Sequence, residues 1–146
     1  MSIEKCLDYN DFKICFHGSF KKIVTEEDNR LFAQLSGDYN PIHFSDETAR
    51  KAGFERRVSN GFVAESRIAA ALVETFGNEN NLVLAIKKNT NFLRPVYMGD
   101  EITARVEVVG RVPSIRLLKI KATCINQNKE QVIETKMLIR ILKKGN

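Results

Sequence analysis

The chain has 146 residues, 43% of them hydrophobic and 28% charged, and a formal net charge of +5. This length predicts a single domain over residues 1–146 that can bury a core, and the composition excludes an intrinsically disordered chain. No apolar run approaches the roughly 18 residues of a spanning helix and no charged-then-apolar leader follows Met1, so we expect a cytoplasmic protein without a membrane partner.

The positive charge is concentrated in the last part of the chain. From Arg111 to Asn146 there are nine Lys or Arg residues against two acids. Several alternate with apolar residues, as on the solvated face of a strand: Lys119, Lys121, Lys136 and Arg140. A phosphorylated cofactor is an alternative partner for such charge. We do not expect nucleic acid, because no aromatic residues interleave with the basic ones.

The cysteines predict neither a disulfide framework nor a zinc site. Cys6, Cys15 and Cys124 are an odd set, without a Cys-x-x-Cys spacing or a histidine cluster beside them. We therefore expect reduced thiols and no bound metal.

The first part of the chain predicts a lead-in segment, a short strand and a capped helix. Residues 1–18 are expected to be a loosely organised lead-in, followed by a strand near Ser19 to Val24. Thr25 can cap the free amides of a helix whose three acidic first residues suit its positive end. Gly37 ends this helix, and its predicted apolar face consists of Leu31, Phe32 and Leu35.

A proline-stiffened loop separates this helix from the next two. Pro41 lacks an amide and favours extended geometry for the residue before it, so residues 37–43 cannot continue the helix. A short helix is predicted from about Asp46 to Ala52, and a longer one from about Gly61 to Phe76. Because apolar residues cover most of the circumference of the longer helix, we expect other elements to enclose it.

From Leu82 onwards the apolar period changes from about 3.6 residues to 2. Three clearly alternating segments lie near residues 102–108, 118–124 and 133–141, with short connections between them. Short connections imply an antiparallel meander. One buried helix and one long sheet with a single apolar face make an α+β fold, with the long antiparallel sheet wrapped around the central helix.

Asp38 and His43 are candidates for general acid/base chemistry. They lie five residues apart across the loop, so both can face one pocket and share a water molecule. Histidine titrates near neutrality and a nearby carboxylate sets its tautomer and basicity, as the addition or removal of water requires. In isolation, a turn-forming Asp and a structural His beside a proline explain the pattern better.

Ser59-Asn60-Gly61 stands at the head of the long helix. Asn60 is a good N-cap by residue type, and Gly61 lets another molecule approach the backbone amides. The free N–H groups and the positive end of the helix dipole are also a donor site for an oxyanion. Capping alone explains Asn60, but it does not exclude this second role.

Together the two features supply what hydration of an α,β-unsaturated thioester requires. A base must activate water at one carbon, an acid must protonate its neighbour, and fixed donors must hold the enolate-like oxygen. No nucleophile triad, phosphate-binding loop or metal-ligand spacing competes with them. His17, the only other histidine, is expected at the surface.

Two stretches carry a resemblance to a known family. The first is Leu35-Ser36-Gly37-Asp38-Tyr39-Asn40-Pro41-Ile42-His43, followed by Asp46, Ala49 and Phe54, and the second is Phe92-Leu93-Arg94-Pro95-Val96-Tyr97-Met98-Gly99-Asp100. They resemble the hydratase signature and the strand-entry pattern of the MaoC-like and (R)-specific enoyl-CoA hydratases. The resemblance extends from about Ser19 to Leu142.

This resemblance implies a hot-dog fold, usually in a homodimer whose sheets join edge to edge. It implies that Asp38 and His43 position and activate water and that the Gly61 amide binds the thioester carbonyl. Asn40 would support the loop, and Asn40, Asn60 and Ser66 complete the expected substrate-binding set. The implied reaction is reversible syn hydration of a trans-2-enoyl-CoA to the (R)-3-hydroxyacyl-CoA. Coenzyme A or an acyl carrier is then part of the substrate, and no prosthetic group is needed.

The chain departs from the family pattern at two positions. The residue before the helix glycine is usually histidine in the family and is Asn60 here, which puts the shape of the helix entrance in doubt more than the reaction. Glu65 lies one turn into an otherwise apolar helix, where a carboxylate without a partner is costly. We favour a structural ion pair with an arginine of another element, over a place at a subunit boundary or in the acyl pocket.

Two other functions stay open. A hot-dog thioesterase would cleave the thioester with a carboxylate and water, and would not need the Asp-x-Asn-Pro-x-His arrangement. A non-catalytic acyl-thioester-binding protein, or a subunit of a larger complex, is compatible with the departure at Asn60.

Overall fold

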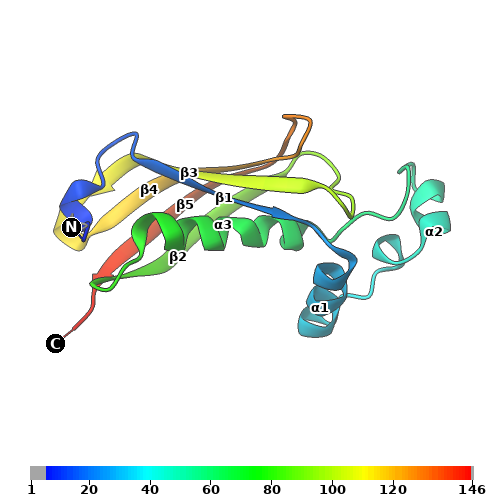
Figure 1. Cartoon of the computed structure of the whole chain (residues 1–146), viewed down its shortest axis with the longest axis horizontal. Helices are drawn as coiled ribbons and strands as arrows, with labels where there is room; N and C mark the ends of the chain where they lie inside the picture. The colour runs from blue at the N-terminus through cyan, green and yellow to red at the C-terminus, as the bar shows by residue number, and fades with distance from the viewer. Residues whose placement is uncertain (1–5, 146) are drawn as a thin grey trace, which may run out of the picture.

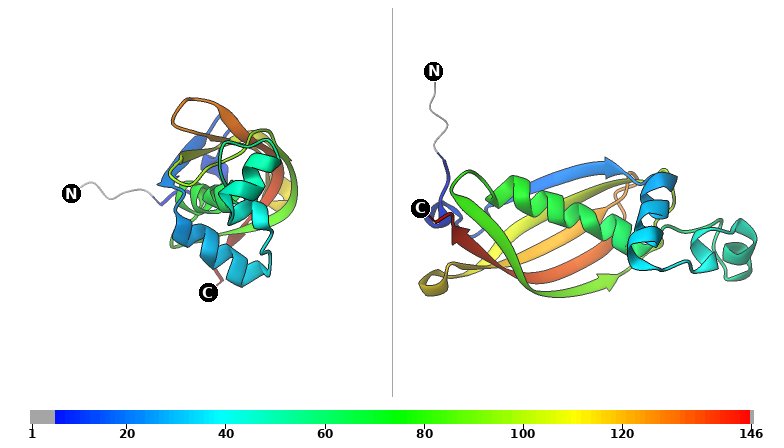
Figure 2. Two further views of the ribbon diagram at one scale, coloured as in Figure 1. Left: turned by 90° about the vertical axis from the view of Figure 1, so that its right-hand side faces the viewer. Right: turned by 90° about the horizontal axis from the view of Figure 1, so that it is seen from below.

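The structure, a computed structural model, describes residues 6–145. A five-stranded antiparallel sheet in the order β1-β3-β4-β5-β2 curves around the central helix α3 (Figures 1 and 2). This confirms the predicted α+β fold, with a long antiparallel sheet wrapped around one helix. The elements in chain order are η1 (Tyr9–Asp11), β1 (His17–Ile23), α1 (Glu26–Ser36), η2 (Pro41–His43), α2 (Asp46–Lys51), α3 (Gly61–Phe76), β2 (Asn81–Phe92), β3 (Glu101–Val112), η3 (Pro113–Ile115), β4 (Leu117–Ile125) and β5 (Gln131–Lys143).

The period-2 pattern puts one face of the sheet against α3. In β3 the apolar residues of the pattern are fully buried, and they are Ile102, Ala104, Val106 and Val108. The intervening side chains face outwards, and Lys119, Lys121 and Lys136 are exposed on the outer face, as predicted. These three lysines therefore solvate this face, whereas Arg140, predicted with them, is only partly exposed.

The order of the strands brings the site together. β3, β4 and β5 follow one another as the predicted meander, whereas β2 pairs with β5 at the far edge of the sheet. Phe92, at the end of β2, consequently lies opposite Ile133, near the start of β5. The N-terminal end of α3 lies over this point (Figure 2).

The central helix is less enclosed than its composition predicts. Phe62 and Val73 of α3 are 53% and 59% exposed, whereas Ile68 and Phe76 are buried. The expectation of full enclosure was wrong for a single chain, because the curved sheet covers only one side of the helix. An apolar stripe of α3 is left open beside the edge strand β2.

Helix α1 begins and ends as predicted but buries a partly different face. Thr25 and Asp28 form a capping box, and Gly37 ends the helix with a left-handed φ of 80°. The predicted apolar face was wrong for Leu31 and Leu35, which are 49% and 84% exposed, whereas Phe32 packs against the core as predicted; the fully buried residues of the helix are Asn29 and Ala33. Phe32 stacks on Phe62 at the start of α3, and the buried Asn29 forms hydrogen bonds with the start of α3 and with the loop after α1.

The lead-in segment is more ordered than expected. Tyr9 and Phe12 are buried, and Phe12 packs edge-on against Phe76 at the end of α3. The Tyr9 hydroxyl donates to the Leu117 carbonyl at 2.8 Å, with the Arg116 guanidinium near the ring face. These residues close the end of the core opposite the pocket. The part of the expectation that concerns residues 1–5 lies outside the described residues.

Across residues 6–145, the helices are too short or too polar to cross a membrane.

A buried ion pair ties α1 to α3. Arg67 Nη2 donates to Asp28 Oδ2 at 2.8 Å and to the Ile23 carbonyl at 3.0 Å. Burial raises the pKa of Asp28, but the hydrogen bonds from the Thr25 amide and from Arg67 outweigh it and hold the pKa below its ordinary value of 3.8. The charged form of Asp28 is therefore favoured in the folded protein.

Asp28→Asn should lower the free energy of unfolding by about 2 kcal/mol at neutral pH, because it leaves a buried guanidinium without its charged partner. The folded-state pKa lies below the unfolded one, so this contribution is present above the unfolded pKa and is lost as the pH falls through the folded value. Urea unfolding at neutral and acidic pH measures it. Glu27→Gln, which removes an exposed partner of Arg30, is the control and should change the unfolding midpoint little. Equal losses in the two variants would contradict this account.

Candidate active site

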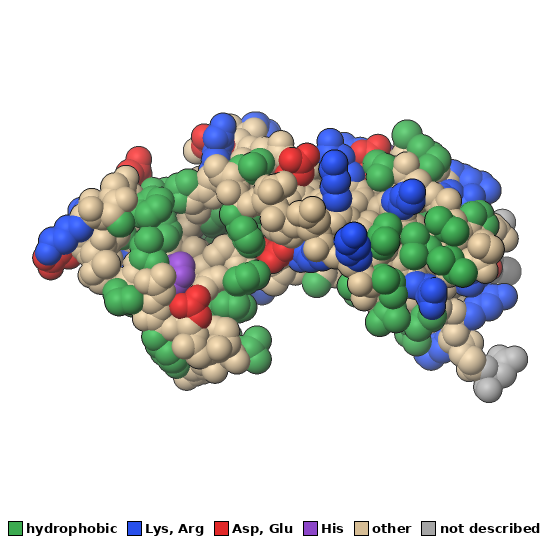
Figure 3. Space-filling model, turned by 180° about the vertical axis from the view of Figure 1, so that it is seen from behind, with side chains coloured by type: hydrophobic (Ala, Val, Ile, Leu, Met, Phe, Trp, Pro, Cys, Tyr) green, Lys and Arg blue, Asp and Glu red, His purple; other side chains and the backbone are tan. Residues whose placement is uncertain are grey.

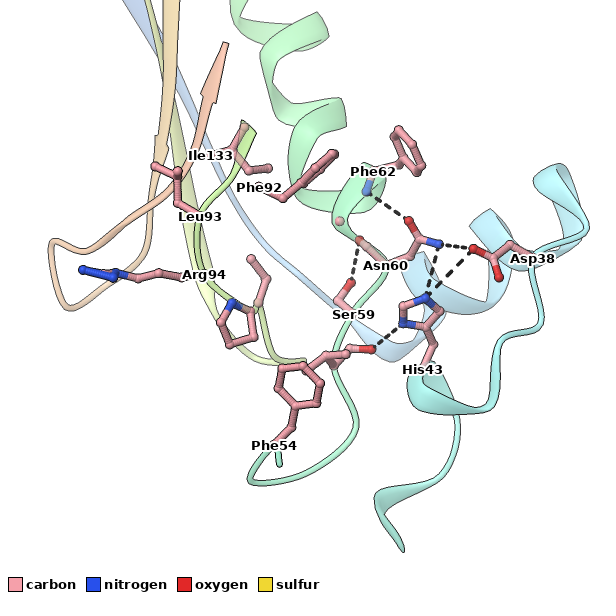
Figure 4. Close-up of a pocket in the computed structure, with 14 residues that line it drawn as sticks. Asp38, His43, Phe54, Ser59, Asn60, Phe62, Phe92, Leu93, Arg94 and Ile133 are labelled. Atoms are coloured by element: carbon pink, nitrogen blue, oxygen red, sulfur yellow. Dashed lines mark hydrogen bonds and ion pairs between the residues drawn. The ribbon is translucent and has the colours of Figure 1, made fainter. Parts of the chain in front are cut away.

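A pocket of about 470 Å³ opens at the N-terminal end of α3. Asp38 and His43 lie on one side of it, and Phe92, Leu93 and Ile133 on the other (Figure 4). In the space-filling view, the histidine visible on this face lies in a hollow beside an acidic side chain and among hydrophobic ones (Figure 3). The lining residues are Asp38, His43, Phe54, Val58, Ser59, Asn60, Gly61, Phe62, Phe92, Leu93, Arg94, Pro95, Val96 and Ile133.

Local hydrogen bonds set the course of the loop between α1 and α2. Asp38 Oδ1 accepts from the Asn40 amide at 3.1 Å, and Asn40 Oδ1 accepts from the Ile42 amide at 3.4 Å. Pro41 begins the short turn η2, where its missing N–H leaves no hydrogen bond unmade. The loop thus turns back, and His43 comes to lie near Asp38.

The ring of His43 is held by the main chain. Its Nδ1 lies 2.9 Å from the Val58 carbonyl, which only accepts, so Nδ1 carries the proton and donates it there. Nε2 is then the nitrogen with the free lone pair, and it lies 4.0 Å from Asp38 Oδ2. The His43 side chain is 13% exposed and that of Asp38 is 42% exposed. One water molecule can bond to both atoms at this separation.

Asn60 joins the helix cap to the acid/base pair. Its Oδ1 accepts from the Phe62 amide at 3.0 Å, which is the cap predicted from the sequence. Its Nδ2 donates to Asp38 Oδ2 at 2.7 Å and lies 3.5 Å from His43 Nε2. The sequence analysis did not include this second contact. Asn60 therefore orients the Asp38 carboxylate while it starts α3.

Gly61 offers an open hydrogen-bond donor in the same pocket. It is the first residue of α3, and the hydrogen bonds found among residues 6–145 leave its N–H without an acceptor. A helix N-terminus also places the positive end of its dipole there. The arrangement therefore brings together an imidazole, a carboxylate and a backbone N–H without an acceptor.

Asn29 of α1, which no sequence pattern indicated, holds the site in place. Its side chain is buried, and its Nδ2 donates to the His43 carbonyl at 3.0 Å. Its Oδ1 accepts from the Asn60 amide at 3.2 Å. These partners lie 14 and 31 residues away, so no local pattern indicates the role.

Two of the predicted residues do not line the pocket. The exposed side chain of Asn40 holds the turn that precedes His43. The Ser66 hydroxyl donates to the Val63 carbonyl at 2.6 Å, on the exposed side of α3. The structure thus gathers Asp38, His43, Asn60 and Gly61, and leaves Ser66 outside.

The family of the chain follows from its sequence. The model of the MaoC-like domain matches residues 16–131. The chain belongs to the MaoC-like domain family. The (R)-specific enoyl-CoA hydratase of Rhodospirillum rubrum is 30% identical to this MaoC-like domain over 137 residues, which cover 94% of the chain and 93% of that protein. The 3-hydroxybutyryl-CoA dehydratase of Methylorubrum extorquens is 29% identical over 140 residues, which cover 96% of the chain and 87% of that protein.

A plant relative and a solved structure are also similar. The mitochondrial 3-hydroxyacyl-[acyl-carrier-protein] dehydratase of Arabidopsis thaliana is 30% identical over 114 residues, which cover 77% of this MaoC-like domain but only 66% of that protein. The R-hydratase PhaJ1 from Pseudomonas aeruginosa superposes with a TM-score of 0.80 at 24% identity, over 94% of the chain and 90% of that structure. The second likeness confirms the hot-dog fold.

Asn60→Asp should separate capping from the contact with Asp38. The variant keeps a good capping oxygen, but it puts a carboxylate where an amide now donates to Asp38 at 2.7 Å. Repulsion raises the pKa of the introduced carboxyl above its unfolded value. The variant should be less stable than wild type by at least about 1.4 kcal/mol at pH 7, the free energy of a one-unit shift. The deficit should shrink below the unfolded pKa and grow as the pH rises through the folded one.

Urea unfolding at about pH 4 and pH 7 measures this difference. Asn60→Ser is the control, since it keeps a capping oxygen without a charge and its deficit should not depend on pH. A pH-independent deficit in Asn60→Asp would mean that the new carboxylate turns away from Asp38.

Proposed function

We propose that the protein is an (R)-specific enoyl-CoA hydratase and 3-hydroxyacyl dehydratase, which reversibly adds water in syn fashion to a trans-2-enoyl thioester. One observation carries this proposal. Asp38 Oδ2 and His43 Nε2, 4.0 Å apart, face the same pocket as the Gly61 N–H. The names of the two relatives most completely covered, a hydratase and a dehydratase, support the same reaction.

The chemistry follows from the positions of these groups. A water molecule held between Asp38 and His43 gives one proton to the pair and its hydroxide to C3 of the enoyl group. The electron pair of the double bond moves towards the thioester carbonyl, whose oxygen accepts a hydrogen bond from Gly61 N–H. Return of the proton from the pair to C2 completes the addition. Because water enters and the proton returns on one side, the addition is syn.

The chain supplies every group in this scheme, so the proposed reaction uses no prosthetic group. The thioester carrier, coenzyme A or an acyl carrier, enters as part of the substrate, and the relatives include proteins named for each. We place the reaction in the cytoplasm, in agreement with the unpaired Cys6, Cys15 and Cys124.

Purified protein should hydrate trans-2-butenoyl-CoA, and Asp38→Asn and His43→Ala should each reduce kcat/KM by roughly 10²-fold or more, as loss of a positioned acid or base does. Loss of enoyl absorbance measures the rate. His17→Ala, which removes the other, exposed histidine, is the matched control and should retain full activity.

The same reaction mixture separates the alternatives. Release of free coenzyme A thiol without a 3-hydroxyacyl product would indicate a thioesterase, and binding without turnover would indicate a non-catalytic protein. Full activity of both folded variants would remove Asp38 and His43 from the mechanism.

We also propose that two copies form a homodimer through β2 and the open side of α3. β2 is an edge strand of 12 residues, and an open edge of this length favours pairing with another chain. Phe92 of β2 and Phe62 and Val73 of α3 are about half exposed, which adds apolar surface beside that edge.

Light scattering at micromolar concentration should give twice the chain mass of 16.6 kDa. Val73→Glu should shift the protein towards the monomer, because it places a charge in the proposed interface. Val109→Glu introduces the same change at a similarly exposed valine on the outer face of the sheet and should stay dimeric. A monomeric wild type, or dissociation of the Val109 variant alone, would contradict this interface.

A further inference from the structure

A buried charged cluster lies next to the pocket, and the proposed reaction uses none of its members. Glu65 of α3 is 7% exposed, and its Oε1 accepts from Thr90 Oγ1 at 2.7 Å. The same oxygen lies 2.7 Å from Lys88 Nζ, and Thr90 Oγ1 also lies 3.0 Å from Thr135 Oγ1. We call these four residues the Glu65 cluster. The partner of Glu65 is thus a lysine of β2, not the arginine expected from the sequence.

The Glu65 cluster is continuous with the pocket, because three of its residues lie on the same elements and faces as three residues that line the pocket. Residues four apart on a helix and two apart on a strand share a face, one turn or one pleat further along. Phe92 and Ile133 are paired in the sheet, and the next pair on the same face is Thr90 and Thr135. From the pocket inwards, the steps along the three elements are Gly61 to Glu65, Phe92 to Thr90, and Ile133 to Thr135.

The Phe92 side chain lies between the pocket and the Glu65 cluster. A Cβ added at Gly61 would lie 2.8 Å from the Phe92 ring, so this ring fills the space between the start of α3 and β2. It packs edge-on against Phe62, with the ring centres 5.6 Å apart. Phe92 is half exposed in the single chain, whereas the residues behind it are joined by hydrogen bonds.

The inner side of the cluster is dry. Thr135 and Cys124 have no exposed surface. Burial, followed by the nearby charge of Glu65, raises the pKa of the Cys124 thiol to about 12. A hydrocarbon chain that entered here would separate Glu65 from its partners and leave a buried carboxylate unpaired, which is strongly unfavourable.

We propose that Glu65, held by Thr90 and Lys88, ends the acyl-binding site and limits the enzyme to short acyl chains. In this proposal a four-carbon enoyl group bound at the Gly61 amide ends before the Phe92 ring, whereas an eight-carbon group would have to move this ring aside and displace the carboxylate. This proposal deepens the proposed function and rests on it. Glu65 acts as a specificity-determining residue and takes no part in the proton transfers.

The test compares kcat/KM for trans-2-butenoyl-CoA and trans-2-octenoyl-CoA. Wild type should favour the four-carbon substrate by at least tenfold, the scale on which pockets discriminate apolar groups. Glu65→Ala should shift the ratio towards the eight-carbon substrate by at least tenfold. In this variant Thr90 keeps Thr135 as its partner, and the partly exposed Lys88 head group can turn to water.

Two control variants isolate the effect of opening the site. Glu65→Gln keeps the side-chain volume and an acceptor for Thr90 but removes the charge, so it should shift the ratio less than Glu65→Ala does. Glu74→Ala removes an exposed carboxylate from the same helix and should keep the wild-type ratio. An unchanged ratio in folded Glu65→Ala would overturn the proposal. Equal turnover of both substrates by the wild-type protein would also overturn it, and this outcome can be observed without any variant.

Binding of the saturated thioesters butanoyl-CoA and octanoyl-CoA, measured by calorimetry, distinguishes the two proposals. If wild type hydrates neither enoyl substrate, the proposed reaction fails. The acyl limit then still requires that octanoyl-CoA bind Glu65→Ala at least tenfold more tightly than it binds wild type. Equal affinities of octanoyl-CoA for Glu65→Ala and wild type would overturn the proposed acyl limit, whatever the outcome for the reaction.

Discussion

The hydrogen bonds of Asn60 are the interaction on which the site depends. The Asn60 side chain caps α3, donates to Asp38 and lies beside His43. The backbone N–H of the same residue donates to the side chain of Asn29 in α1. The start of the central helix, the loop after α1 and α1 itself are therefore fixed at one residue. Since helix N-terminal amides need acceptors in any case, the same side chain satisfies a structural requirement of the helix and orients Asp38 in the pocket.

Charged groups inside the molecule tie α3 to its neighbours on two sides. Arg67 reaches Asp28 of α1, and Glu65 reaches Lys88 of β2. Each pair lies within one or two turns of Gly61, so the end of the helix that carries the free Gly61 N–H is anchored on both flanks. The other end of α3 is held by aromatic packing of Phe76 against Phe12. The polar contacts at the N-terminal end of α3 are directional and fix its position, whereas the apolar packing at the other end is non-directional and contributes mainly to stability.

Local patterns predicted the elements well and their partners poorly. Caps at Thr25 and Asn60 and the period-2 strands depend on neighbouring residues, so the bounds of α3 and the strands of the meander followed from the sequence. The burial of Asn29 on α1 did not, because the groups that cover it, the His43 carbonyl and the Asn60 backbone N–H, are distant in sequence. The family motif predicted that Asp38 and His43 lie together, and their acid/base role stays a prediction. The contacts of Asn29, and the pairing of Glu65 with Lys88, join residues distant in sequence and have no local signature.

The bond from His43 to the Val58 carbonyl has a consequence for how the site tolerates change. In many histidine-dependent sites a carboxylate side chain fixes the tautomer, and one substitution there abolishes it. Here the acceptor is a main-chain oxygen, which every amino acid supplies. Substitutions at position 58 can alter packing without altering which ring nitrogen is protonated. The tautomer of His43 therefore does not depend on which amino acid stands at position 58, and the role of this position cannot be inferred from the identity of its side chain.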